Sequence, residues 1–145
     1  MNQDSRTVYS LHGDGELQEG QNWEAIMFAA HNKVDNLIAT VDVNGQQIDG
    51  STNHVLSLES LEAKWKAFNW DVLHMDGNNI DEVVSVLEKA KGMLGKGKPV
   101  CILMKTVMGK GVSFMEGTHE WHGIAPNEAQ LAEALAQLPE TLGDY

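Results

Sequence analysis

The sequence has little positive charge and almost no cysteine. It carries 10 Lys and Arg residues against 21 Asp and Glu residues, which gives a formal net charge of −11 at pH 7. This deficit argues against nucleic acid as a partner, because affinity for nucleic acid comes largely from Lys and Arg. The one cysteine, Cys101, lies in an apolar run, which favours a buried thiol in a protein of the reducing cytoplasm.

Long apolar runs are also missing. No stretch approaches the roughly 18–20 apolar residues that a membrane span needs, and residues 1–6 have no apolar segment typical of a secretory signal. We therefore expect no membrane partner. With 145 residues, of which 42% are apolar, the chain has room for one domain with its own core. We interpret residues 1–145 as that single domain.

Short apolar segments alternate with helical patterns along the chain. Partly β-branched segments at residues 7–11, 37–41, 71–75 and 100–104 predict buried strands. Apolar residues at helical spacing predict helices within 23–30, 58–68 and 80–87, the last with Asn79 as N-cap. A final helix is expected over 126–138, with Pro126 in its first turn. This alternation predicts an α/β fold with an open, mainly parallel sheet of about four strands flanked by helices.

The predicted sheet is small. Open sheets usually have about five or six strands, so a sheet of four leaves one edge bare. We interpret the chain as the second half of a larger, incomplete domain. The bare edge and an exposed helix surface predict self-association or a missing partner.

The strongest local signal is the turn Gly13-Asp14-Gly15, which follows the first predicted strand and precedes a helix. Ligands of open α/β sheets bind at the carboxyl ends of the strands. Gly13 and Gly15 permit a sharp turn and a close approach of the backbone to a ligand. We expect free N–H groups of the following helix to face an anion there.

The second predicted strand ends in Asp42 and Asn44. If the two strands are neighbours, Asp14 and Asn44 lie side by side at one sheet edge. A carboxylate, an amide carbonyl and one backbone carbonyl beside a phosphate-binding turn suit Mg²⁺. The pattern is not an EF-hand calcium loop, because the sixth residue counted from Asp42 is Gln47 and the twelfth is Thr52. Asp42 itself either supports the metal ligands without binding the metal or is simply a carboxylate at the end of a strand.

Together these two segments resemble the thiamine-diphosphate motif, which begins Gly-Asp-Gly and closes at an Asn. Here 28 residues separate Gly15 from Asn44. Further blocks make the sequence similar to the transketolase family in particular. These blocks are residues 13–20, 44–50, 108–112 and 122–126, in that order along the chain.

The resemblance implies roles for individual residues. Asp14 and Asn44 would bind Mg²⁺ through their side chains, with the backbone carbonyl of Gln46 as the third ligand. Gly13 and Gly15 would bring the backbone close to the diphosphate of the cofactor.

The same resemblance implies roles for three further side chains. Ile48 would pack against the rings of the cofactor. His122 would reach the diphosphate and the substrate, and Glu19 would join a proton network near a subunit interface. These last two are the candidate catalytic residues. The alternatives are a surface histidine for His122 and a helix first-turn charge for Glu19.

The implied activity is transfer of a two-carbon glycolaldehyde unit from a ketose phosphate to an aldose phosphate, with Mg²⁺ and thiamine diphosphate, in the pentose phosphate pathway. The implied partners are a C-terminal transketolase subunit with the pyrimidine-binding domain, a second copy, and sugar phosphates. A histidine-containing segment of the family has no counterpart in residues 1–6, so we expect an isolated chain to be inactive. The alternatives are a non-catalytic binding or assembly module, or another thiamine-diphosphate enzyme such as deoxyxylulose-phosphate synthase or a dehydrogenase subunit.

Overall fold

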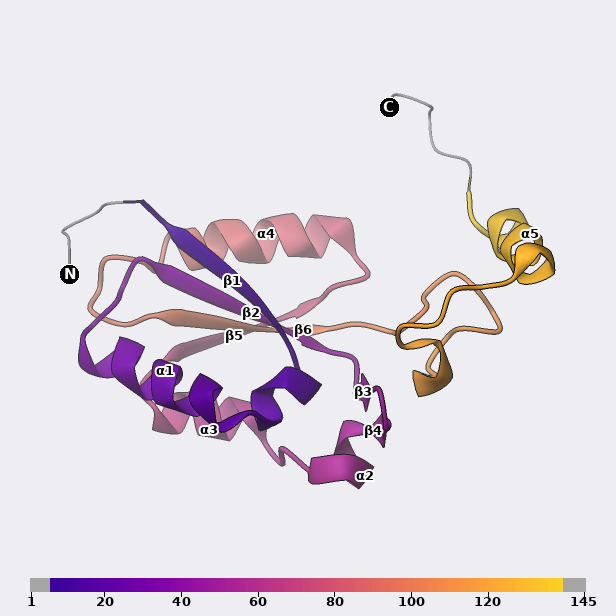
Figure 1. Cartoon of the computed structure of the whole chain (residues 1–145). Helices are drawn as coiled ribbons and strands as arrows, with labels where there is room; N and C mark the ends of the chain where they lie inside the picture. The colour runs from indigo at the N-terminus through magenta and orange to yellow at the C-terminus, as the bar shows by residue number, and fades with distance from the viewer. Residues whose placement is uncertain (1–5, 140–145) are drawn as a thin grey trace.

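The core of the protein is a four-stranded parallel sheet with the strand order β1-β2-β6-β5, seen in a computed structural model that describes residues 6–139 (Figure 1). Its strands are β1 (Val8–Gly13), β2 (Leu37–Val43), β5 (Asp71–Asp76) and β6 (Val100–Lys105). All three pairings are parallel. The predicted α/β class and the four predicted strands are thereby confirmed.

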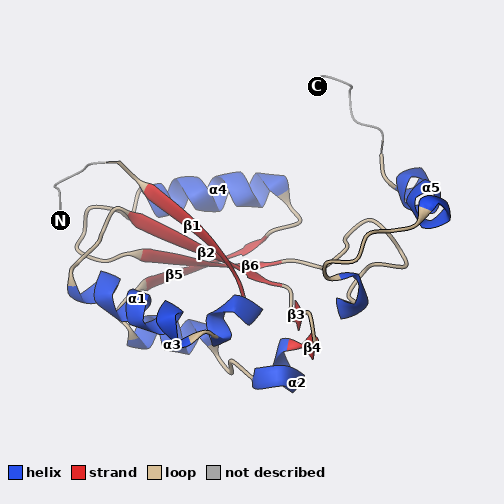
Figure 2. Cartoon of the chain, in the orientation of Figure 1, coloured by secondary structure: helices blue, strands red, loops and turns tan. Residues whose placement is uncertain are grey.

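Helices cover both faces of the sheet (Figure 2). On one face lie α1 (Gly20–His31) and α3 (Leu61–Ala67), and on the other lies α4 (Ile80–Lys91). Each face of the sheet has its own hydrophobic core, and strand β6 contributes side chains to both. Cys101 and Leu103 pack with α1 and α3, whereas Val100 and Ile102 pack under α4. A strand buried on both faces has to be continuously apolar. This is why residues 100–104 show no alternation.

The helix starts follow local capping chemistry. The Asn79 side chain accepts the N–H of Glu82 at 3.3 Å and caps α4, as predicted. Acidic residues in the first turn of α4 complement the helix dipole. The Ser60 hydroxyl caps α3 in the same way by accepting the N–H of Ala63 at 3.1 Å.

The last helix, α5 (Glu128–Gln137), begins later than predicted. Asn127 accepts the N–H of Gln130 at 3.0 Å, and the Gln130 side chain accepts the N–H of Asn127 at 2.9 Å. This capping box places Pro126 before the helix, so its predicted place in the first turn is wrong. Figure 1 shows α5 standing away from the sheet.

Several short elements lie at the carboxyl ends of the strands and were not predicted. They are the 3₁₀ helices η1 (Gly15–Gln18) and η2 (His119–Trp121), the strands β3 (Gln46–Gln47) and β4 (Gly50–Ser51), and the helix α2 (Thr52–Leu56). β3 and β4 form a small antiparallel pair of their own. Within residues 6–139, no helix is long and apolar enough to cross a membrane.

Candidate functional site

A cavity of about 450 Å³ lies where β1 and β2 end. Gly13 of β1 pairs with Asp42 of β2, so the segments that follow both strands start side by side. The cavity is lined by Gly13, Asp14, Gly15, Glu16, Asp42, Asn44, Gln46, Gln47, Ile48, Asp49 and His122. The structure therefore brings together the predicted residues of both loops and His122 from far along the chain.

Asp14 is the most buried polar residue of the cavity, with 3% of its surface exposed. One carboxylate oxygen accepts the N–H of Gly15 at 2.8 Å and the other accepts the N–H of Gly45 at 2.7 Å. Burial raises the pKa of the Asp14 carboxyl, these two hydrogen bonds partly oppose the rise, and the nearby charge of Asp42 adds to it. A cation beside Asp14 and Asp42 would relieve this repulsion.

Two side chains that line the cavity, Asp42 and Asn44, also hold the loop after β2 in place. The Asn44 side-chain oxygen accepts the N–H of Gln46 at 2.8 Å, and its amide lies 3.4 Å from the Asp42 carboxylate. Asp42 also accepts a hydrogen bond from the hydroxyl of Thr106, which follows β6. Asp42 thus links the ends of two strands behind Asn44, and Thr106 is a supporting residue that the sequence pattern did not reveal.

Gly15 faces Gln47 across the cavity. A Cβ added at Gly15 would lie 3.0 Å from the Cβ of Gln47, so any side chain there would crowd the opposite loop. The side-chain oxygen of Gln47 is buried and has no hydrogen-bond partner among the described residues. The close approach favours a glycine at this turn.

The turn differs from prediction in how its N–H groups are used. The N–H of Gly13 donates to the Glu16 carboxylate at 3.2 Å and that of Gly15 donates to Asp14. The element that follows is the four-residue 3₁₀ helix η1 rather than the start of α1. We expected free N–H groups of the following helix to face an anion, but the N–H of Gly15, the first residue of η1, is bound by Asp14, and that of Gly13 before it is bound by Glu16.

Ile48 and His122 line the same cavity from other segments. Ile48 lines the cavity and is 70% exposed although it is apolar. His122 follows η2, and its N–H donates to the carbonyl of His119 at 2.9 Å. Glu19, by contrast, is the exposed N-cap of α1 and does not line the cavity.

The cavity is strongly acidic. Four of its lining residues are carboxylates, namely Asp14, Glu16, Asp42 and Asp49, and none of the described residues that line it is Lys or Arg. Within residues 6–139, no group of three or more His, Cys, Asp or Glu side chains could hold a metal ion. Mg²⁺ does not need such a group, because it usually takes one or two carboxylates together with phosphate and water. A phosphorylated ligand would need a cation to enter.

A parallel sheet with a carboxylate-lined cavity at the ends of two adjacent strands is typical of ligand-binding α/β domains. Residues 2–141 match the family model described as "Transketolase, thiamine diphosphate binding domain". The chain belongs to this family, and the predicted resemblance is confirmed.

Curated relatives and solved structures agree with this assignment. The chain is 48% identical over 132 residues to the 6-deoxy-6-sulfo-D-fructose transketolase subunit SqwG of Clostridium sp. (strain MSTE9), covering 91% of this chain and 47% of that subunit. It is 40% identical to an apulose-4-phosphate transketolase subunit of Phocaeicola vulgatus, covering 93% of this chain and 47% of that subunit. A crystal structure of transketolase from Campylobacter jejuni superposes with a TM-score of 0.82 at 34% identity, covering 91% of this chain and 20% of that one. The chain spans about half the length of these two curated relatives.

Proposed function

We propose that this chain is the diphosphate-binding part of an N-terminal transketolase subunit. The complete enzyme would transfer a two-carbon glycolaldehyde unit from a ketose phosphate to an aldose phosphate. The observation that carries the proposal is the buried Asp14 carboxylate, which lies next to the Asn44 loop in the cavity. The residues that line this cavity all fall within residues 2–141, which match the family model. Because the chain spans about half of the curated relatives, we expect it to be inactive alone.

For the metal, we propose that Mg²⁺ is held by the side chains of Asp14 and Asn44 and by the backbone carbonyl of Gln46. All three residues line the acidic cavity, and oxygen ligands of this kind suit Mg²⁺. To bind through its oxygen, Asn44 has to share the atom that now accepts the Gln46 N–H. Asp42 and Thr106 would then orient the loop from behind.

For thiamine diphosphate, we propose that Gly13 and Gly15 let the backbone approach the diphosphate. The open space beside Gly13, where an added Cβ would meet nothing within 4 Å, supports this, whereas Gly15 lies close against Gln47. Ile48 would cover an apolar ring, and His122 would contact the diphosphate and the substrate. When bound, the cofactor supplies the nucleophilic carbon of the reaction, and the protein holds and orients it.

The proposed partners are a C-terminal transketolase subunit with the pyrimidine-binding domain, a second copy, and sugar phosphates as substrates. Glu19 is exposed at the start of α1, which suits a proton network across a subunit interface better than a direct contact in the cavity.

We propose the cytoplasm as the compartment and the pentose phosphate pathway as the context. The buried, unpaired thiol of Cys101 is compatible with a reducing compartment.

Calorimetric titration of thiamine diphosphate into the chain, with Mg²⁺ or with a chelator, tests the proposed site. We expect Mg²⁺-dependent heat that Asp14→Asn abolishes. Asp81→Asn, on the exposed first turn of α4, is the matched control and should bind as the unchanged chain does. Heat that is independent of Mg²⁺, or unchanged in Asp14→Asn, would contradict the site. Binding without two-carbon transfer, once the rest of the N-terminal subunit and a C-terminal subunit are added, would favour the non-catalytic module.

A further inference from the structure

The two glutamines of β3 contact different segments of the chain. The side-chain oxygen of Gln47 is buried close to Gly15, in the turn after β1. The side-chain amide of Gln46 instead donates to the backbone carbonyl of Gly117 at 3.4 Å. Successive side chains of a strand point to opposite sides. β3 therefore contacts the turn after β1 on one side and the segment that leads to His122 on the other.

The segment from Met108 to Gly117 is a compact unit held by its own hydrogen bonds. The Gly117 N–H donates to the carbonyl of Met108 at 2.9 Å and closes the unit. Within it, the N–H groups of Met115 and Glu116 both donate to the carbonyl of Val112, whose side chain is buried. Because these bonds are internal, they do not fix where the unit lies on the protein.

Contacts with other segments fix that position. The Asn78 side chain accepts the Val107 N–H at 2.9 Å just before the unit, and Gln137 of α5 accepts the Ser113 N–H at 2.7 Å. Neither contact involves the cavity between the ends of β1 and β2. Among residues 6–139, the bond from Gln46 is the one hydrogen bond that joins residues 108–122 to the loops after these two strands.

From Gly117 the chain continues through η2 to His122. The His122 N–H donates to the carbonyl of His119 at 2.9 Å. The Trp121 ring meets the Phe114 ring edge-on with centroids 5.2 Å apart, which braces η2 against the unit that ends at Gly117. The position of His122 at the cavity therefore depends on where Gly117 is held.

The position of His122 matters because of the charge of this cavity. Four of the residues that line it are carboxylates, and His122 is the one described lining residue that can become a cation. The attraction between a cation and an anionic ligand weakens with distance and is screened by salt. A displaced His122 would therefore contribute little to binding an anion at this cavity.

We propose that Gln46 is a positioning residue for His122. Its side-chain amide holds residues 117–122 beside the cavity, which both Gln46 and His122 line. The inference rests on the proposed function, in which the backbone carbonyl of Gln46 binds Mg²⁺ and His122 contacts the diphosphate. One residue thereby sets the distance between the metal and the histidine, because the carbonyl and the amide both belong to it.

Nuclear magnetic resonance of the full chain tests this with Gln46→Leu, which removes the donor and leaves the backbone carbonyl. Without metal, we expect hydrogen exchange of the Gly117 and His122 N–H groups to become about fivefold faster, as the loss of one hydrogen bond predicts. Gln46→Lys restores a donor and should restore slow exchange. Gln18→Leu is the matched control and should change neither rate, because the half-buried Gln18 also donates to a backbone carbonyl, that of Leu56 at 2.9 Å.

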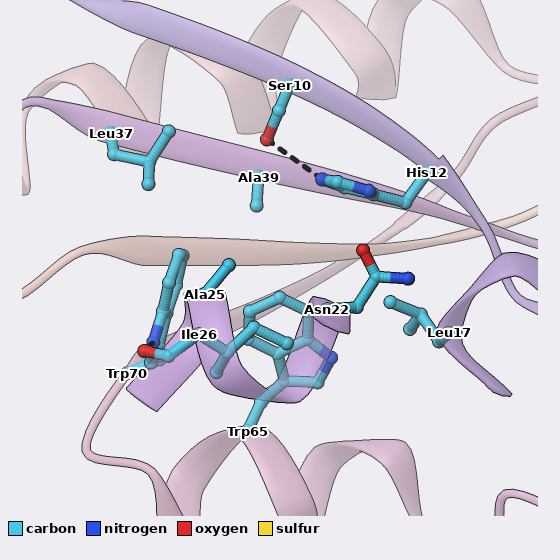
Figure 3. Close-up of a pocket in the computed structure, with 10 residues that line it drawn as sticks. All are labelled: Ser10, His12, Leu17, Asn22, Ala25, Ile26, Leu37, Ala39, Trp65 and Trp70. Carbon is cyan, nitrogen blue, oxygen red and sulfur yellow. Dashed lines mark hydrogen bonds between the residues drawn. The ribbon is translucent and has the colours of Figure 1, made fainter. Parts of the chain in front are cut away.

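A second readout distinguishes positioning from a contact that only supports the loop. Mn²⁺ in place of Mg²⁺, added with thiamine diphosphate, broadens the ring signals of histidines that lie close to it. His12 is the internal reference, because its ring is 3.2 Å from Glu16 of the carboxylate-lined cavity. It is placed without Gln46, since it lies 3.1 Å from the Ser10 hydroxyl in a separate cavity between β1 and α1 (Figure 3). We expect Gln46→Leu to lose the broadening of His122 and keep that of His12, and Gln46→Lys to regain both.

Unchanged exchange of Gly117 and His122 in Gln46→Leu would overturn the proposal, whether or not metal binds. Equal broadening of His122 in the unchanged chain and in Gln46→Leu would also overturn it. If Mn²⁺ fails to broaden His12 in the unchanged chain, the proposed metal site is wrong, and the exchange rates still decide the role of Gln46. Circular dichroism checks that Gln46→Leu folds. If it does not, Gln46→Glu replaces it, because Glu has nearly the same size and lacks the donor.

Discussion

The Asp14 carboxylate accepts the backbone N–H of Gly45 at 2.7 Å and thereby ties the turn after β1 to the loop after β2. The same carboxylate holds its own turn through the N–H of Gly15. Burial makes these bonds necessary, because an unpaired buried N–H or carboxylate is costly. One residue therefore fixes the relative position of both loops that form the candidate site.

Replacing Ile48 with Ser should weaken cofactor binding without changing stability. Ile48 is 70% exposed, so the free energy of unfolding should change by no more than about 0.5 kcal/mol. Covering an Ile side chain contributes about 1.5–3 kcal/mol, so the affinity for thiamine diphosphate should fall about tenfold or more. Ile124→Ser, which is also exposed but outside the cavity, is the control for the calorimetric titration. Equal affinities for the two variants would remove Ile48 from the site.

Much of the fold could be predicted because burial imposes simple patterns. β6 is apolar from Val100 to Met104, as a strand covered on both faces must be. The neighbourhood of Asp14 and Asn44 followed from the pairing of consecutive strands. The start of α5 could not be predicted from Pro126, because proline is tolerated both in a first helical turn and just before a helix. The Asn127 capping box decides between these two positions.

The candidate site was less accessible to prediction from local pattern. His122 reaches the cavity through an irregular segment, and no periodicity connects that segment with β1 or β2. The motif resemblance supplied that assignment. Glu16 was missed because a carboxylate just after a turn resembles an ordinary helix first-turn charge. Only the hydrogen bond from the Gly13 N–H to the Glu16 carboxylate shows that Glu16 belongs to the turn and is not merely a first-turn helix charge.

Gly109 and Gly117 offer a matched test of the loop that leads to His122. Both have positive φ angles, of 68° and 71°. A Cβ at Gly117 would meet open space, so Gly117→Ala should cost about 1–2 kcal/mol of stability from the backbone angle alone. At Gly109 a Cβ would lie 2.5 Å from the carbonyl oxygen of Met115, which should add roughly 1–3 kcal/mol. Urea denaturation measures the difference, and similar costs would contradict the packing of this loop.

Trp65 and Trp70 provide a second matched pair, in the core between α3 and the sheet. Their rings meet edge-on with centroids 4.7 Å apart, and both are buried. The Trp70 Nε1–H donates to the carbonyl of Ile26 at 3.0 Å, whereas Nε1 of Trp65 has no partner among the described residues. Replacement by Phe should therefore cost about 1 kcal/mol more at Trp70 than at Trp65. Denaturant midpoints followed by circular dichroism would show this, and a larger cost at Trp65 would contradict it.

Cys101 should make stability fall at alkaline pH. Burial raises the pKa of its thiol far above the ordinary value of 9.0, so the folded chain keeps the proton that the unfolded chain loses. The free energy of unfolding then decreases as pH rises above 9.0, because the unfolded state binds fewer protons. For one group this amounts to about 1.4 kcal/mol at pH 10. Cys101→Ala lacks this dependence, although the cavity that it creates lowers its stability by a similar amount at every pH.

The measurement is therefore the difference in unfolding free energy between the unchanged chain and Cys101→Ala, at pH 7.5 and at pH 10. Other titrating groups cancel in this difference, because both proteins share them. The advantage of the unchanged chain should shrink by about 1.4 kcal/mol between the two pH values. A thiol-reactive dye should also fail to label the folded chain and label it quickly in urea, since the side chain is buried. A constant difference across this pH range would mean that solvent reaches the thiol between α1 and the sheet.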